Sequence, residues 1–145
     1  MKIQTKYHGE VEIQEKDILT FEKGIPGFLD EKKFTLLPLP DMTSVSIMQS
    51  VETAGLAFVI ADPYSFFEKY DFSLDENTVE QLDIKSDTDV SAFVILTVHD
   101  PFEESTANLQ APIVVNIKTN KAKQVILNNE NYKTKHPLFG QLAKG

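Results

Sequence analysis

The chain has 145 residues, a net charge of −8, no cysteine and no arginine. This length predicts one domain, residues 1–145, that buries its own core. The missing cysteine excludes disulfides, thiolate zinc sites and a cysteine nucleophile. The sequence has neither an apolar signal region nor an apolar run long enough to cross a membrane, so we expect a cytoplasmic protein without membrane contact.

Charge is distributed unevenly along the chain. Residues 1–104 carry 8 Lys and 21 acidic residues, a net −13, whereas residues 105–145 carry 6 Lys and one acidic residue, a net +5. The segment 62–89 alone has nine acidic residues and two lysines, a net −7. An acidic surface without arginine disfavours direct nucleic-acid binding and favours a basic protein partner. Acidic residues that serve only solubility or helix capping explain the same charge.

Short alternating or apolar segments predict a chain dominated by β-strands. They lie at residues 2–7, 11–13, 18–21, 34–37, 45–50, 56–61, 90–98, 112–118 and 122–127. The alternation in 45–50 predicts one wet face, whereas 56–61 is apolar throughout and predicts a strand covered on both sides. Many short strands with frequent turns predict a mainly β, single-domain, antiparallel β-barrel-like fold with one or two short helices. The basic tail, from about residue 132, is predicted to lie on the surface.

The sequence Ala-Phe-Val-Ile occurs twice, at residues 57–60 and at 92–95. Each copy is followed by an Asp-Pro pair, Asp62-Pro63 and Asp100-Pro101. Two copies do not make a solenoid. We interpret them as two neighbouring central strands that leave the sheet at similar corners.

Two short helices are predicted on the connection between these strands. Asp62 can cap a helix whose first position is Pro63, and aromatic residues follow at helical spacing. The pattern at 73–76, Ser-Leu-Asp-Glu, resembles a capping box and predicts a second helix that buries Val79 and Leu82.

The segment 21–28, Phe-Glu-Lys-Gly-Ile-Pro-Gly-Phe, is predicted to form a rigid elbow. Gly24 and Gly27 permit backbone angles that other residues disfavour, and the proline between them fixes its own φ. We expect Phe21 and Phe28 to anchor both ends of the elbow in the core. The segment is not a phosphate loop, because it lacks the further glycine and the Lys-Ser/Thr ending.

The elbow has a structural interpretation and a functional one. A corner with aromatic anchors follows from the general preference of glycine and proline for turns. In the functional interpretation, Ile25 and Pro26 lie at an exposed tip and contact a partner directly.

No catalytic, metal-binding or cofactor-binding constellation is present in the sequence. His8, His99 and His136 lie in separate segments without ligand spacing, and no serine-nucleophile motif occurs. We therefore predict a binding protein rather than an enzyme.

An ordered set of motifs in this chain resembles the FliW family of flagellar assembly factors. The motifs are Phe21-x-x-Gly24-Ile25-Pro26-Gly27-Phe28, Gln49-Ser50, Leu56-Ala57-Phe58-Val59, Asp62-Pro63, Tyr70, residues 108–116 (Asn-Leu-Gln-Ala-Pro-Ile-Val-Val-Asn) and residues 121–127 (Lys-Ala-Lys-Gln-Val-Ile-Leu). The resemblance covers residues 3–139. Relatives often carry Arg near the position of Lys121, a change that keeps the charge.

The resemblance implies a non-enzymatic protein with a small β-barrel-like fold. Members of this family bind CsrA, an RNA-binding translational repressor, and relieve its repression of flagellin mRNA. They also bind flagellin, so that flagellin withdraws the factor from CsrA in a partner-switching circuit. We further expect a monomer when free, and no cofactor.

The predicted partner-binding residues are acidic, with the two elbow residues as an alternative: Asp71, Asp75, Glu76, Glu80, Ile25 and Pro26. The predicted structural signature comprises Phe21, Gly24, Gly27, Phe28, Asp62 and Pro63. A small-molecule- or carbohydrate-binding β-barrel is the alternative function, and it requires a cavity lined by polar groups.

Overall fold

A computed structural model describes residues 1–39 and 42–138 of the chain. Pro40, predicted as a strand terminator, and residues 139–145 of the predicted basic tail lie outside the described residues. The strands are β1 (Lys2–Gln4), β2 (Glu10–Glu12), β3 (Ile18–Thr20), β4 (Lys33–Leu39), β5 (Met42–Ser50), β6 (Ala57–Ala61), β7 (Val90–Thr97), β8 (Thr106–Ala107), β9 (Ile113–Asn116), β10 (Ala122–Gln124) and β11 (His136–Pro137). The α-helix is α1 (Glu76–Gln81), and 3-10 turns span Glu15–Asp17, Pro63–Ser65, Asp87–Asp89 and Phe102–Glu104.

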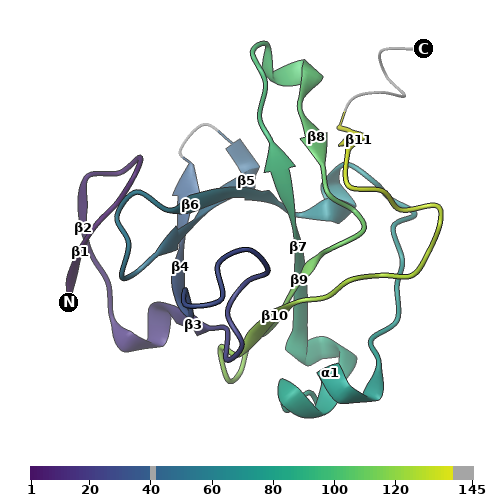
Figure 1. The fold of residues 1–145 in the computed structure, drawn as a ribbon, viewed down its shortest axis with the longest axis horizontal. Coiled ribbons are helices and arrows are strands. Elements are labelled where there is room, and N and C mark those ends of the chain that lie inside the picture. Colours follow the sequence, from purple (N-terminus) through teal and green to yellow (C-terminus); the bar gives the residue numbers. More distant parts are fainter. Residues whose placement is uncertain (40–41, 139–145) are drawn as a thin grey trace.

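One antiparallel sheet runs in the order β10-β9-β7-β6-β5-β4-β3, and the short strands β8 and β11 extend it from β7. β1 and β2 form a separate hairpin. Figure 1 shows the sheet curling around, so that β3 and β10 approach one another. The two edges meet at one parallel bridge, Thr20 to Lys121, where the Thr20 amide donates to the Asn120 carbonyl at 2.8 Å. The predicted mainly β, antiparallel single domain is confirmed, but the sheet is not closed into a true barrel.

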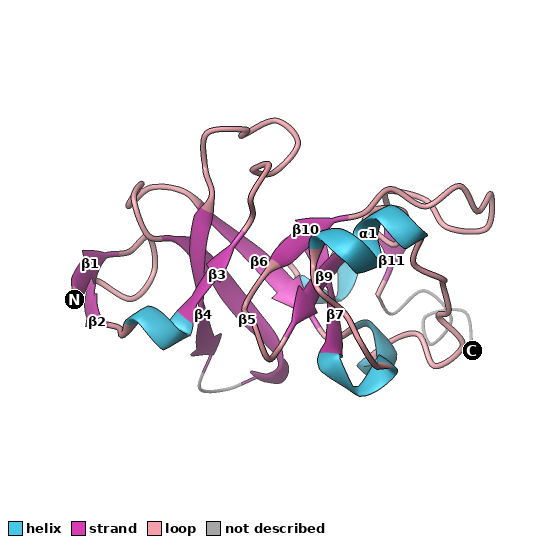
Figure 2. Ribbon diagram, turned by 90° about the horizontal axis from the view of Figure 1, so that it is seen from below, coloured by secondary structure: helices cyan, strands magenta, loops and turns pink. Residues whose placement is uncertain are grey.

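Both faces of the curled sheet are covered by apolar side chains. The inner core contains side chains from the strands and from the elbow: Leu19, Phe21, Ile25, Phe34, Met48, Ile60, Ile113, Val115 and Ala122. The outer core lies between the sheet, the 62–72 connection and the C-terminal segment: Val45, Ala61, Tyr70, Val94, Leu96, Ala107, Leu109, Leu127 and Leu138. Figure 2 shows α1 beside β9 and β10. Because successive side chains of a strand point to opposite faces, neighbours such as Ile60 and Ala61 serve different cores.

The repeated Ala-Phe-Val-Ile segments form β6 and β7, which are paired as predicted, with Ile60 opposite Ile95. The corners that follow them differ. Asp62 accepts a hydrogen bond from the Tyr64 amide at 3.0 Å and caps the turn Pro63–Ser65. The Asp100-Pro101 bond is cis, and no side chain caps the turn after it.

The predicted helices are only partly confirmed. The first is a single 3-10 turn, Pro63–Ser65, rather than a helix reaching the later aromatic residues. The second is α1, whose N-cap is Asp75: its carboxylate accepts from the Thr78 amide at 3.0 Å. Leu82 is buried as predicted, whereas Val79 is half-buried.

The prediction of a wet face on β5 is wrong from Ile47 to Ser50, where every residue is buried. Gln49 is fully buried because its side chain is a hydrogen-bonding junction. Its Oε1 accepts from the Lys6 amide at 2.9 Å, and its Nε2 donates to the carbonyls of Ser50 and Ala54 at 3.0 and 3.1 Å. The loop after β1 and the turn after β5 therefore cover this face.

The C-terminal segment is more embedded than predicted. β11 pairs with β8, and Leu138 is 6% exposed within the outer core. Tyr132 packs its ring edge-on against Tyr70, with centroids 4.8 Å apart. The lysines of the segment, Lys133 and Lys135, are exposed.

The prediction for the elbow is confirmed at Phe21 and wrong at Phe28 and Ile25. Phe21 is fully buried as expected, but Phe28 is 44% exposed and contacts Phe58 edge-on at 5.8 Å. Ile25, predicted at the exposed tip, is 1% exposed and belongs to the inner core. The reason is a tight turn at Pro26-Gly27, in which the Phe28 amide donates to the Ile25 carbonyl at 2.7 Å.

The two elbow glycines both have positive φ, +72° at Gly24 and +89° at Gly27, but their surroundings differ. A Cβ added at Gly24 would overlap the backbone carbonyl of Leu29, whereas one at Gly27 would meet nothing within 4 Å. Gly24 is therefore required by packing as well as by its backbone angle.

We predict that Gly24→Ala destabilises the protein far more than Gly27→Ala. The second substitution adds only the strain of a positive φ, about 1–2 kcal/mol. The first adds a backbone overlap and should exceed about 3 kcal/mol. Urea unfolding of both variants gives the comparison, and equal losses of stability would contradict this account of the elbow.

Candidate functional site

The predicted acidic residues are all exposed, but the structure does not bring all four together. Asp75, Glu76 and Glu80 lie at the start and on the outer side of α1. Asp71 lies on the connection before α1, where its amide donates to the hydroxyl of Tyr132 at 2.9 Å. Hydrogen bonds from Thr78 hold the pKa of Asp75 below its usual value. The predicted acidic surface thus has two parts.

The opposite side of α1 is held to the sheet by lysines of the β10 region. Lys123 Nζ donates to Gln81 Oε1 at 2.8 Å, and Lys121 Nζ pairs with Asp83 Oδ2 at 2.7 Å. The Lys121–Asp83 contact raises the pKa of the lysine and lowers that of the carboxyl group. In the part of the chain that the structure describes, neither Glu76 nor Glu80 forms an ion pair. Their charges are available to a partner.

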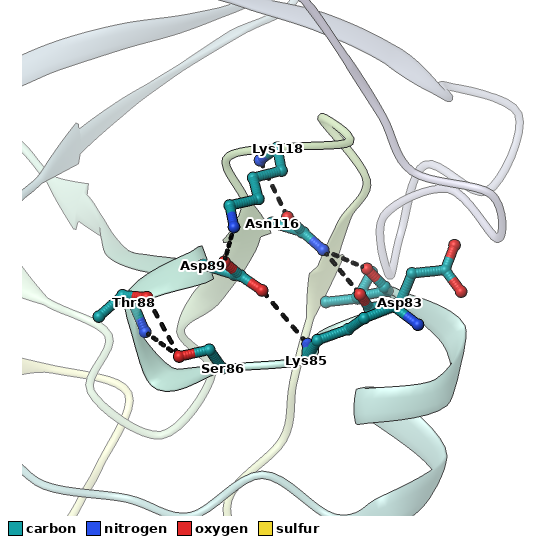
Figure 3. Close-up of polar contacts among 8 residues, drawn as sticks. Asp83, Lys85, Ser86, Thr88, Asp89, Asn116 and Lys118 are labelled. Carbon is teal, nitrogen blue, oxygen red and sulfur yellow. Dashed lines mark hydrogen bonds and ion pairs between the residues drawn. The ribbon is translucent and has the colours of Figure 1, made fainter.

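A polar cluster fixes the end of α1 to the β9–β10 hairpin (Figure 3). Asn116 is 1% exposed, and its Nδ2 donates to the carbonyls of Leu82 and Asp83 at 2.7 and 3.2 Å. Its Oδ1 accepts from the Lys118 amide at 2.9 Å. The buried Asp89 carboxylate pairs with Lys118 Nζ at 3.0 Å and accepts from the Lys85 amide at 3.3 Å.

Sequence reasoning missed this cluster. The available signal was an asparagine that ends the buried apolar run Ile113–Val115, because a polar side chain in such a position needs partners. The partners, Leu82 and Asp83, are more than thirty residues away in the chain. Since these bonds hold α1, the cluster supports the acidic surface without being part of it.

An aromatic cluster lies around Tyr70, on the connection that leads from β6 to α1. Tyr70 is central: its hydroxyl donates to the Leu109 carbonyl at 2.7 Å, and burial strongly raises its pKa. Phe72, Tyr132 and Tyr64 pack around it, with ring centroids 5.3, 4.8 and 6.1 Å away. These rings join the connection before α1 to the C-terminal segment.

The elbow presents Pro26, Phe28 and Leu29 to solvent, and Leu29 is 65% exposed. Glu31, which follows the elbow, is hydrogen-bonded to the end of β5 and the turn after it. Its two carboxylate oxygens accept from Ser50 Oγ at 2.7 Å and from Thr53 Oγ1 at 2.6 Å. Pro26 stays a predicted contact residue, whereas Ile25 is removed from that set by its burial.

The inner core is filled by side chains, which argues against a ligand cavity inside the curled sheet. An open groove of about 310 Å³ lies between the 12–17 segment and strands β3 and β4. A small hollow of about 30 Å³ lies between the elbow and the end of α1. Across residues 1–39 and 42–138, no three His, Asp or Glu side chains are grouped to hold a metal ion. The described residues contain no helix with the length and apolar character needed to span a membrane.

The family model described as "FliW protein" matches residues 2–138 of the chain. This chain belongs to the FliW family. The flagellar assembly factor FliW of Geobacillus thermodenitrificans (strain NG80-2) is 61% identical to it, with 96% of each chain covered. FliW of Bacillus subtilis (strain 168) is 52% identical over 97% of this chain and 99% of its own.

A solved FliW structure has the same fold. The crystal structure of the flagellar assembly factor FliW superimposes with a TM-score of 0.91 and 59% identity, covering 95% of this chain and 96% of the other. The family resemblance inferred from the motifs is therefore confirmed over nearly the whole chain.

We predict that Asp89→Asn lowers stability at neutral pH and that the loss shrinks in acid. The ion pair with Lys118 holds the pKa of Asp89 below its unfolded value. Its contribution is therefore present above an unfolded pKa of about 4 and disappears as the pH falls through the lower folded pKa. Chemical unfolding of wild type and variant at pH 7 and pH 3 measures the difference.

Asp87→Asn is the matched control, because Asp87 lies on the same turn but is exposed. It should change stability little at either pH. A stability difference between wild type and Asp89→Asn that persisted unchanged at pH 3 would contradict the assigned ion pair.

Proposed function

We propose that this chain is a non-enzymatic flagellar assembly factor that binds CsrA, relieves its repression of flagellin mRNA, and is withdrawn from CsrA by flagellin. The observation that carries the flagellar role is the 61% identity, across 96% of both chains, to a relative named flagellar assembly factor FliW. CsrA and flagellin enter from the family resemblance of the sequence motifs. The protein acts in the cytoplasm and is a monomer when free.

The exposed acidic side chains of α1 support a basic partner such as CsrA. An RNA-binding protein is expected to carry basic surface, and complementary charge accelerates and orients association. Glu76 and Glu80 are exposed and unpaired within the described residues, while the lysines Lys121 and Lys123 are engaged on the inner side of α1. The helix therefore presents net negative charge outward.

We predict that Glu76→Lys combined with Glu80→Lys slows association with CsrA and weakens the salt dependence of its rate. Rim charges act mainly on the association rate, so a decrease of about tenfold at low ionic strength is expected. Asp75 is left intact because it caps α1. Asp75→Asn then tests its charge alone, since asparagine caps equally well. Stopped-flow kinetics at several salt concentrations provide the measurement.

The matched control reverses the same number of charges elsewhere, with Glu12→Lys and Glu15→Lys. Both residues are exposed and lie in the N-terminal segment, which Figure 1 shows on the other side of the molecule from α1. If the control pair slowed association as much as the α1 pair, net charge rather than this surface would set the rate. Unchanged kinetics in the α1 pair would exclude the acidic helix from the encounter.

Flagellin is proposed to contribute a helical segment, since an apolar helix face laid in a groove is a common form of recognition. We predict that purified flagellin displaces CsrA from the protein in a concentration-dependent manner. A fluorescence competition assay with labelled CsrA measures this displacement, and single flagellin helices identify the segment. Formation of a stable ternary complex would contradict partner switching, and failure of every helical fragment would contradict the helix-in-groove mode.

A further inference from the structure

Tyr64 is a half-exposed aromatic residue at the edge of the outer core. It is 48% exposed, and its ring packs beside that of Tyr70 with centroids 6.1 Å apart. It follows Pro63, which is buried and fixes the turn after β6. The ring is thus held by the fold while much of its surface stays open to solvent.

Two acidic residues, Asp62 and Asp71, lie near Tyr64. Asp62 and Asp71 are both exposed, and both lie near enough to Tyr64 to add to the effect of burial in raising its pKa. No ion pair joins either carboxylate to a lysine within residues 1–39 and 42–138. The ring and its two negative charges therefore have no cation from the described part of the chain itself.

Hydrogen bonds hold the carboxylate of Asp62 and the backbone of Asp71. Asp62 accepts from the Tyr64 amide at 3.0 Å and from Ser65 Oγ at 3.2 Å. Asp71 is positioned through its amide, which donates to the Tyr132 hydroxyl at 2.9 Å. Tyr132 in turn packs against the buried Tyr70. A ligand would meet a ring and an Asp62 carboxylate that are already held in place, which lowers the cost of binding.

Tyr7 offers a comparison within the same chain. It is exposed to a similar degree, 54%, but Lys6 Nζ lies over its ring, 5.3 Å from the centroid. That ring already has a cation on its face. Tyr64 instead has two acidic residues near it, Asp62 and Asp71.

We propose that Tyr64, Asp62 and Asp71 form a recognition site for an arginine side chain of a protein partner, here called the Tyr64 site. A guanidinium stacks on a tyrosine face and at the same time donates hydrogen bonds to carboxylates in its own plane. Lysine is a poorer fit, because its compact ammonium is strongly hydrated and does not stack. This proposal rests on the proposed function in one respect: CsrA is taken as the basic protein that supplies the arginine.

The direct test is an NMR titration of the ¹⁵N-labelled protein with a short acetylated peptide containing two arginines. The matched probe carries citrulline in place of arginine, which keeps the shape and removes the charge. The arginine peptide should shift amide resonances at residues 62–65, 71 and 132, and the citrulline peptide should not. Tyr64→Ala should weaken peptide binding at least fivefold, whereas Tyr64→Phe, which keeps the ring, should bind nearly as well as wild type.

Tyr7→Ala is the control for loss of an exposed aromatic residue, and it should leave peptide binding unchanged. Shifts confined to α1, equal binding of the citrulline peptide, or peptide affinity unaffected by Tyr64→Ala would each overturn the site. Equal affinity for a lysine peptide would overturn the assignment to arginine. Thermal unfolding of each variant confirms that it remains folded.

Calorimetry with CsrA separates this proposal from the proposed function. Tyr64→Ala and Asp71→Asn should each weaken CsrA binding about fivefold, while Tyr7→Ala should not. Normal CsrA binding by both Tyr64→Ala and Asp71→Asn would show that CsrA does not use the Tyr64 site. If CsrA failed to bind the wild-type protein, the proposed function would fall and the peptide titration alone would decide the site.

Discussion

The packing of the elbow into the curled sheet is the constraint on which the rest of the structure depends. The sheet does not close by a full ladder, and its interior is filled by side chains from the strands together with two from the elbow. The elbow contributes Phe21 and Ile25, and both are almost completely buried. Their insertion requires the chain to pass close to the Leu29 backbone, which only a glycine at position 24 permits. Sheet curvature, core and elbow therefore form one unit.

The outer face of the same sheet supports the surfaces that we assign to binding. The outer core lies under the 62–72 connection, and α1 is attached to the sheet by hydrogen bonds from Asn116 and Lys123 and by the Lys121–Asp83 ion pair. Acidic residues can then face solvent without weakening the fold. A short helix depends on such polar attachments. The stability of the polar cluster of Asn116 and Asp89 therefore affects how α1 holds its acidic side chains toward solvent.

The acidic region is better described as two surfaces than as one. The helix surface carries the exposed charges of Glu76 and Glu80, and it suits a role in the rate of encounter. The Tyr64 site combines charge with a fixed ring, and it suits a defined contact with one side chain. A partner that is first attracted by the helix and then held at the Tyr64 site would use both. The apolar elbow residues Phe28 and Leu29 lie outside this arrangement.

The sequence by itself determined the features that depend on neighbouring residues. Turn chemistry identified the elbow and the Asp62 cap, the repeated Ala-Phe-Val-Ile segments identified the paired central strands, and the ordered motifs identified the family. Only the tertiary structure decided which side of each segment is buried. Ile25 faces the core and Phe28 leans outward because strands distant in the chain surround the elbow, and Tyr132 reaches Tyr70 and Asp71 from the far end of the sequence. Burial and electrostatic surroundings at these positions are set by contacts between residues that are far apart in the chain. Local sequence patterns do not contain this information.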